Sequence, residues 1–82
     1  MKRDYTDQKI GFILRKYREE SGFTQQELAD WMGKSKPTIS LWESGKRSIN
    51  VVDFVKIIEI LGCDTKKVSD ELLDIVPPKR GK

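Results

Sequence analysis

The side chains best suited to chemistry lie between residues 34 and 52. This stretch contains four basic residues, Lys34, Lys36, Lys46 and Arg47, and a single carboxylate, Glu43. Short hydroxyl side chains are interspersed among these cations, and such groups contact the phosphates and base edges of nucleic acids. The same residues would also make an ordinary solvated surface, so charge alone leaves both interpretations open.

The rest of the chain distributes its charge differently. Residues 1–33 carry as many acidic as basic side chains, and residues 53–76 carry an excess of acidic ones. The end of the sequence is basic again, and the net charge is +3. Positive charge is therefore local, which is the pattern expected of a protein that binds a polyanion through one surface.

The composition argues against several classes of function. The chain has no histidine and one cysteine, Cys63, which excludes a disulfide framework and argues against a zinc site. No carboxylate cluster is evident either, so we predict no enzymatic activity, no metal and no cofactor. No apolar run approaches the roughly 20 residues that span a bilayer, and no secretory signal is evident, so we expect a cytoplasmic protein without membrane contact.

The elements that must position the basic stretch are helices. Helix start signals occur at Thr6, at Thr24 with Glu27 three residues later, at Ser35 and at Asn50. Helix-ending glycines follow at Gly22, Gly33, Gly45 and Gly62. A fifth helix is predicted from Asp64 or Thr65 onward. We therefore predict an all-α domain over residues 6–76, between a flexible segment at 1–5 and a basic tail at 77–82 carrying Lys79, Arg80 and Lys82.

The second and third predicted helices, within residues 23–48, are joined by a tight turn. Helix, glycine turn and helix make a helix-turn-helix unit, whose second helix fits the DNA major groove, about 12 Å wide. Ile39 and Trp42 are predicted to face the core, with Trp42 as core filling and Trp31 of the preceding helix only partly buried. The side chains predicted to face outward from the second helix of the unit are Lys36, Pro37, Thr38, Ser40, Leu41 and Ser44.

The fourth predicted helix is more apolar than one buried face requires. Phe54, Ile57, Ile58 and Leu61 suffice for the core, which leaves Val52, Val55 and Ile60 to be covered. The fifth helix, which carries Val68, Leu72 and Leu73, is one possible cover. A second copy of the chain is the other.

Several motifs occur together with regular spacing. They are Arg18 and Gly22, the run from Thr24 to Ala29, the run from Ile39 to Arg47, and Leu61 with Gly62. In this combination the region from Ile10 to Asp64 resembles the Cro/CI-like, or XRE-like, family of helix-turn-helix transcriptional regulators. The resemblance implies the five-helix fold of lambda-repressor-like domains, with the helix-turn-helix at helices two and three.

The resemblance also implies roles for single residues. The base-contacting positions would be Lys36, Pro37, Thr38, Ser40 and Leu41, and the positions that contact the DNA backbone would be Gln25, Ser44, Lys46 and Arg47. Arg18 and Glu43 would form a salt bridge between helices one and three. Family members often have Gln or Arg where this chain has Pro37 and Leu41, so hydrogen bonding to guanine would depend on Lys36.

The leading hypothesis from the sequence is a repressor or controller protein that binds a palindromic operator in double-stranded DNA as a homodimer. The dimer interface is expected at Val52, Val55, Ile60 and Leu72, and no small-molecule ligand is expected. A phage-type repressor, a restriction–modification controller and an antitoxin all remain open. The alternative function is a protein-binding module that docks a different partner through helices four and five.

Overall fold

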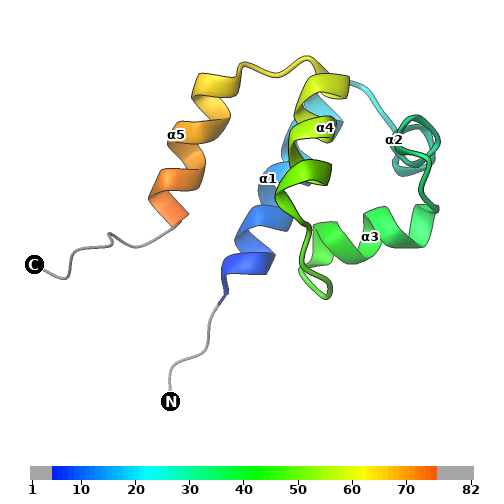
Figure 1. The fold of residues 1–82 in the computed structure, drawn as a ribbon, viewed down its shortest axis with the longest axis horizontal. Helices are drawn as coiled ribbons and strands as arrows, with labels where there is room; N and C mark the ends of the chain where they lie inside the picture. Colours follow the sequence, from blue (N-terminus) through cyan, green and yellow to red (C-terminus); the bar gives the residue numbers. More distant parts are fainter. Residues whose placement is uncertain (1–4, 76–82) are drawn as a thin grey trace, which may run out of the picture.

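A computed structural model describes residues 5–75, which form five α-helices and no strand (Figure 1). The helices are α1 (Thr6–Glu20), α2 (Gln25–Met32), α3 (Lys36–Ser44), α4 (Val51–Leu61) and α5 (Thr65–Ile75). The predicted all-α, five-helix fold is confirmed. The predicted segment 1–5, apart from Tyr5, and the basic tail 77–82 lie outside the described residues.

Three of the helices begin at the predicted capping residues. Thr24 accepts a hydrogen bond from the backbone N–H of Glu27 at 3.0 Å, and the Glu27 carboxylate accepts one from the N–H of Thr24 at 2.8 Å. Ser35 and Asn50 cap α3 and α4 by accepting hydrogen bonds from the backbone N–H groups of Thr38 and Asp53. The predicted cap at Thr6 is wrong. The carbonyl of Tyr5 accepts the first helical hydrogen bond, so Tyr5 is the cap residue and Thr6 lies within α1.

The turn between α2 and α3 depends on a left-handed residue. Gly33 has φ 68°, a conformation that costs glycine little and other residues more. Its N–H and that of Lys34 return to carbonyls of the last turn of α2, at Asp30 and Ala29 respectively. These bonds close α2 tightly, so that α3 begins only a few residues later.

The helices surround one hydrophobic core. Figure 1 shows α5 on the opposite side of α1 and α4 from α2 and α3. The buried apolar side chains come from all five helices and are Ile13, Leu14, Tyr17, Leu28, Ala29, Ile39, Trp42, Ile57, Ile58, Leu61 and Val68. Trp42 fills the core, as predicted, whereas Trp31 is 71% exposed and therefore more open than predicted, because it faces away from this core. No helix within residues 5–75 has both the length and the apolar character to cross a bilayer.

Backbone meets backbone where α1 crosses α3. A Cβ atom placed on Gly11 would lie 2.4 Å from the carbonyl oxygen of Trp42 and 2.5 Å from that of Glu43. Only a residue without a side chain allows this approach. Gly11 therefore fixes how closely α3 lies against α1, and the sequence reasoning did not single it out.

The outer face of α4 is only partly covered. Val52 and Val55 are 59% and 52% exposed, while Ile60 and Leu72 are half-buried against the core. Between α4 and α5 runs an open apolar groove of about 330 Å³, lined among others by Phe54, Val55 and Leu72. The fifth helix thus covers some of the apolar side chains of α4 that the core does not need, but it leaves Val52 and Val55 in contact with solvent.

A polar contact also joins α5 to α1. The Glu71 carboxylate accepts hydrogen bonds from the ammonium of Lys16 at 2.7 Å and from the hydroxyl of Tyr17. Both bonds favour the ionised carboxylate, and they lower the pKa of Glu71, with Lys16 as the largest cause. Burial and the same hydrogen bond raise the pKa of Tyr17, so its hydroxyl stays protonated as a donor.

We expect Glu71→Gln to lower the free energy of unfolding by about 1–2 kcal/mol at pH 7, because a hydrogen bond to a charged group contributes about 1.5–3 kcal/mol and solvent weakens this partly exposed pair. Because the folded-state pKa of Glu71 is lowered, the contribution is complete above its unfolded pKa and disappears as the pH falls through the folded value. Urea denaturation at pH 7 and at pH 3 measures this. The difference between wild type and variant should shrink at the lower pH. Asp74→Asn, at an exposed site on the same helix, is the control and should change little.

Candidate nucleic-acid interface

The outward face of α3 is open to solvent. Its inward residues Ile39 and Trp42 are 1% and 5% exposed, which anchors the helix to the core. On the other side Lys36, Pro37 and Ser40 are exposed, while Thr38 and Leu41 are half-buried. All five predicted base-contacting residues therefore lie on one short helix, which Figure 1 shows at the edge of the molecule.

The polar side chains of α3 differ in their freedom to reach a ligand. The hydroxyls of Ser35 and Thr38 lie 3.0 Å apart, and the hydroxyl of Ser44 donates to the carbonyl of Leu41 at 3.2 Å. These short groups are thus partly engaged within their own helix. Lys36 is exposed and has a long side chain, so it has the greatest reach from this face.

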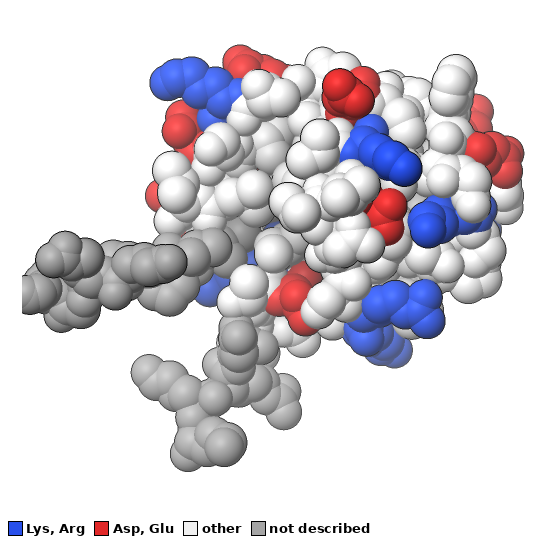
Figure 2. Space-filling view, viewed as in Figure 1, with Lys and Arg blue, Asp and Glu red and all other residues white. Residues whose placement is uncertain are grey.

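A basic loop follows α3 and is held in place on both sides. The backbone N–H groups of Lys46 and Arg47 both point to the carbonyl of Leu41, at 3.0 and 3.3 Å. The hydroxyl of Ser48 donates to the carboxylate of Asp7 at 2.6 Å, which joins the loop to the start of α1. Both cations are exposed, and Figure 2 shows basic side chains gathered over the region of α3. The loop therefore presents fixed positive charge next to the outward face of α3.

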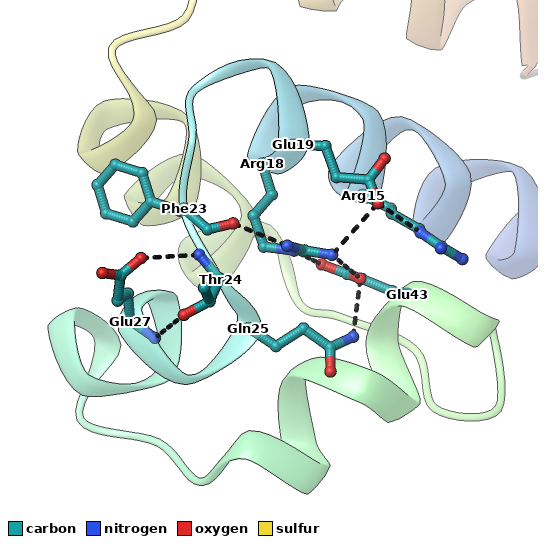
Figure 3. Close-up of polar contacts among 8 residues, drawn as sticks. All are labelled: Arg15, Arg18, Glu19, Phe23, Thr24, Gln25, Glu27 and Glu43. Carbon is teal, nitrogen blue, oxygen red and sulfur yellow. Dashed lines mark hydrogen bonds and ion pairs between the residues drawn. The ribbon is translucent and has the colours of Figure 1, made fainter.

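Arg18 and Glu43 form a nearly buried ion pair between α1 and α3 (Figure 3). Arg18 Nε donates to Glu43 Oε2 at 2.7 Å and its Nη2 to Oε1 at 3.1 Å, while its Nη1 donates to the carbonyl of Phe23 at 2.8 Å. The hydrogen bond to Glu43 raises the pKa of Arg18 above its usual value. The guanidinium therefore stays charged, and its bonds fix the last turn of α3 against the end of α1.

Gln25 is the first residue of α2, where backbone N–H groups lack helical partners and attract anions. Its side chain does not extend freely into solvent. The amide Nε2 donates to Glu43 Oε1 at 3.0 Å (Figure 3), so this one carboxylate of α3 contacts both α1 and α2. The family resemblance implied the Arg18–Glu43 pair, which spans 25 positions, whereas nothing in the sequence indicated this second bond, which spans 18.

The structure brings the predicted backbone-contacting residues to the same side as α3. Ser44 is the last residue of α3, and Lys46 and Arg47 follow it in the chain. Gln25 is connected to the last turn of α3 through Glu43. Sequence reasoning missed Gly11 and the contact between Asp7 and Ser48. A glycine inside a helix destabilises it by about 1 kcal/mol relative to alanine, so a glycine at such a position indicates a specific requirement. At Gly11 that requirement is the close approach of α1 and α3.

The described part of the chain also bears on metal binding and on Cys63. Residues 5–75 contain no group of three or more His, Cys, Asp or Glu residues placed to hold a metal ion. Cys63 is half-buried, and burial raises the pKa of its thiol, which makes it a poor nucleophile.

Comparison with known proteins gives consistent matches. The HTH_3 helix-turn-helix family model matches residues 14–68. Antitoxin HipB of Escherichia coli (strain K12) is 31% identical over 72 residues, which are 82% of this chain and 82% of HipB. An HTH-type transcriptional regulator of Methanothermobacter thermautotrophicus is 36% identical over 50 residues, covering 61% and 72% of the two chains. The crystal structure of the clp gene regulator ClgR from C. glutamicum shares the fold, with a TM-score of 0.75 at 24% identity over 88% of this chain and 92% of that one.

Proposed function

This chain belongs to the HTH_3 helix-turn-helix family, and on that premise we propose that it is a transcriptional regulator that reads double-stranded DNA through α3. The observation that carries the proposal is the division of α3 into two faces. Ile39 and Trp42 hold the helix rigidly against the core, while Lys36, Pro37 and Ser40 remain exposed. A helix supported in this way fits the major groove with its outer side chains toward the base edges.

The proposed contacts fall into two classes. Base edges would be contacted by Lys36, Pro37, Thr38, Ser40 and Leu41, and phosphates by Gln25, Ser44, Lys46 and Arg47. Phosphate contacts set position and orientation without reading sequence, whereas base contacts give specificity. Pro37 carries no donor, so it would act through shape or contact with a thymine methyl group. Lys36 would be the principal hydrogen-bond donor to a base.

We further propose that the protein binds a palindromic operator as a homodimer. One α3 reaches few base pairs, each worth about 1–3 kcal/mol of discrimination, which is little against the many non-specific sites of a genome. Two copies would read half-sites about 34 Å apart on one face of the duplex. The exposed Val52 and Val55, with the half-buried Ile60 and Leu72 beside them, form the surface proposed for this contact.

Substituting the two classes of lysine should separate their roles. Lys46→Ala is expected to weaken binding to all duplexes and to reduce the slope of log affinity against log salt by about one unit. Lys36→Ala is also expected to weaken binding, by about 1–3 kcal/mol, and in addition to relax the preference for one particular base in the site. Fluorescence anisotropy over a salt series would measure the slope, and selection from random duplexes would measure the preference. Equal proportional losses of specific and non-specific binding in both variants would contradict the assigned roles.

The dimer is tested by Val55→Asp. A charge at this exposed apolar site should prevent burial against a second copy while leaving the monomer folded, because Val55 lies outside the core. Sedimentation at micromolar concentration is expected to show a dimer for the wild type and a monomer for the variant, together with loss of tight operator binding. Lys56→Ala, at the next exposed position of α4, makes the same change in net charge and serves as the control. A wild-type monomer that binds a single operator tightly would refute the dimer.

A second candidate function is supported by the similarity to antitoxin HipB. In that case the open groove between α4 and α5 would dock a different protein, and DNA binding would accompany this contact. The two functions differ in their partner and in their response to salt. Stable co-purification with another chain, through Val55 and with little salt dependence of DNA binding, would favour the antitoxin-like function.

A further inference from the structure

The Glu43 carboxylate lies at the junction of three helices and is almost inaccessible, with 4% of its side chain exposed. Its Oε2 accepts from Arg18 Nε, and its Oε1 accepts both from Arg18 Nη2 at 3.1 Å and from Gln25 Nε2 at 3.0 Å. Glu43 itself does not face solvent. Any influence on a ligand must therefore act through the side chains that it holds.

This arrangement selects one orientation of the Gln25 amide. An ionised carboxylate only accepts hydrogen bonds, so the nitrogen of the amide must face Glu43 and the oxygen must point away. One hydrogen of Nε2 is used in this bond, and the second remains available as a donor. A glutamine without this contact would rotate freely and present oxygen or nitrogen with similar ease.

We propose that Glu43 is a positioning residue for DNA, which orients the Gln25 amide so that its second N–H meets a backbone phosphate at the start of α2. This inference rests on the proposed function. It gives a specific reason why the start of α2 would bind a phosphate of the duplex. The free backbone N–H groups at the start of α2 supply further donors to the same anion. Phosphate oxygens only accept hydrogen bonds, as the Glu43 carboxylate does. The NH₂ group of Gln25 can therefore donate one hydrogen bond to each of them.

Arg18 makes this arrangement compatible with an approaching phosphate. A lone carboxylate behind Gln25 would repel the anion, but Arg18 is bound to both of its oxygens and offsets its charge. The guanidinium is itself fixed by the carbonyl of Phe23 at 2.8 Å. Glu43 thus orients the glutamine amide without leaving a net negative charge beside the DNA.

The proposal is tested by asking whether Glu43→Gln changes the effect of Gln25→Ala on DNA affinity. The probe is a fluorescent mixed-sequence duplex at low salt, titrated with wild type, Gln25→Ala, Glu43→Gln and the double variant. Gln25→Ala should lower affinity about tenfold in the wild type and by no more than about twofold in the Glu43→Gln background, because a neutral amide at position 43 no longer selects the orientation. Lys46→Ala, the matched control, should cost the same factor in both backgrounds.

Equal losses from Gln25→Ala in the two backgrounds would overturn the role of Glu43 while leaving the proposed function intact. A wild-type protein that binds no duplex at low salt would overturn both. A merely structural Glu43 would lower all affinities together and leave the cost of Gln25→Ala unchanged. The double-variant comparison therefore distinguishes the three outcomes.

Nuclear magnetic resonance of the free, full-length chain gives a second test that does not depend on the affinity of any variant. The side-chain amide of Gln25 should show one proton exchanging slowly with water, because it is bound to the inaccessible Glu43 carboxylate, and one exchanging fast. The exposed Gln8 should show two fast protons. Identical exchange of both Gln25 protons, at the rate of Gln8, would contradict the orientation. Addition of the duplex should slow the remaining fast proton.

Discussion

Arg18→Met is expected to lower the free energy of unfolding by about 3–5 kcal/mol, the cost typical of breaking a buried ion pair by removing one partner. Methionine preserves much of the volume of the arginine stem but donates no hydrogen bond. The Glu43 carboxylate would then remain at 4% exposure with only Gln25 as a donor, and the carbonyl of Phe23 would lose its partner. Since domains of this kind are stable by only about 5–15 kcal/mol, the loss should be visible as a large fall in the urea midpoint.

The double variant Arg18→Met/Glu43→Leu is the control for this prediction. Replacing both members of a buried pair by apolar residues is often neutral or stabilising, so most of the lost stability should return. DNA affinity should not return with it, because Gln25 would have lost the carboxylate that orients its amide. If the free energy of unfolding of Arg18→Met is less than about 1 kcal/mol below that of the wild type, the ion pair contributes little to the stability of the fold.

The features predicted correctly from local sequence patterns depend on neighbouring residues, whereas the Arg18–Glu43 pair, 25 positions apart, was implied only by the family resemblance. Caps at Thr24, Ser35 and Asn50 act within the first turn of their own helix, so three or four consecutive residues determine them. The left-handed glycine at position 33 is equally local. Local signals of this kind, together with the 3.6-residue apolar period, sufficed for the five helices and for the outward face of α3.

The contacts that sequence reasoning missed join residues far apart in the chain. Glu71 meets Lys16 and Tyr17 across 55 and 54 positions, and Asp7 meets Ser48 across 41. No periodicity within one helix indicates which side chains of two helices will meet, because that depends on crossing angle and separation. The exposure of Trp31 had the same origin, since only the packed arrangement shows which side of the α2 apolar stripe is left uncovered.

Gly11→Ala is expected to destabilise the protein by about 3 kcal/mol, although the same change in an ordinary helix interior stabilises it by up to about 1 kcal/mol. The sign reverses because the new methyl group would lie 2.4 Å from the Trp42 carbonyl oxygen and 2.5 Å from that of Glu43. Backbone carbonyls of a helix cannot rotate out of the way as a side chain can. The helices α1 and α3 must therefore separate, and the tilt of α3 must change. Urea denaturation would measure the loss of stability.

The same separation should disturb DNA binding beyond what lost stability explains, because Glu43 moves with the last turn of α3 and carries Gln25 with it. Duplex affinity measured well below the denaturation midpoint should fall several-fold in Gly11→Ala. Lys9→Ala, at an exposed position in the same helix, is the matched control and should stay within about 0.5 kcal/mol of wild type in stability. A Gly11→Ala variant more stable than wild type would mean that α1 and α3 do not approach as closely in solution as this backbone contact requires.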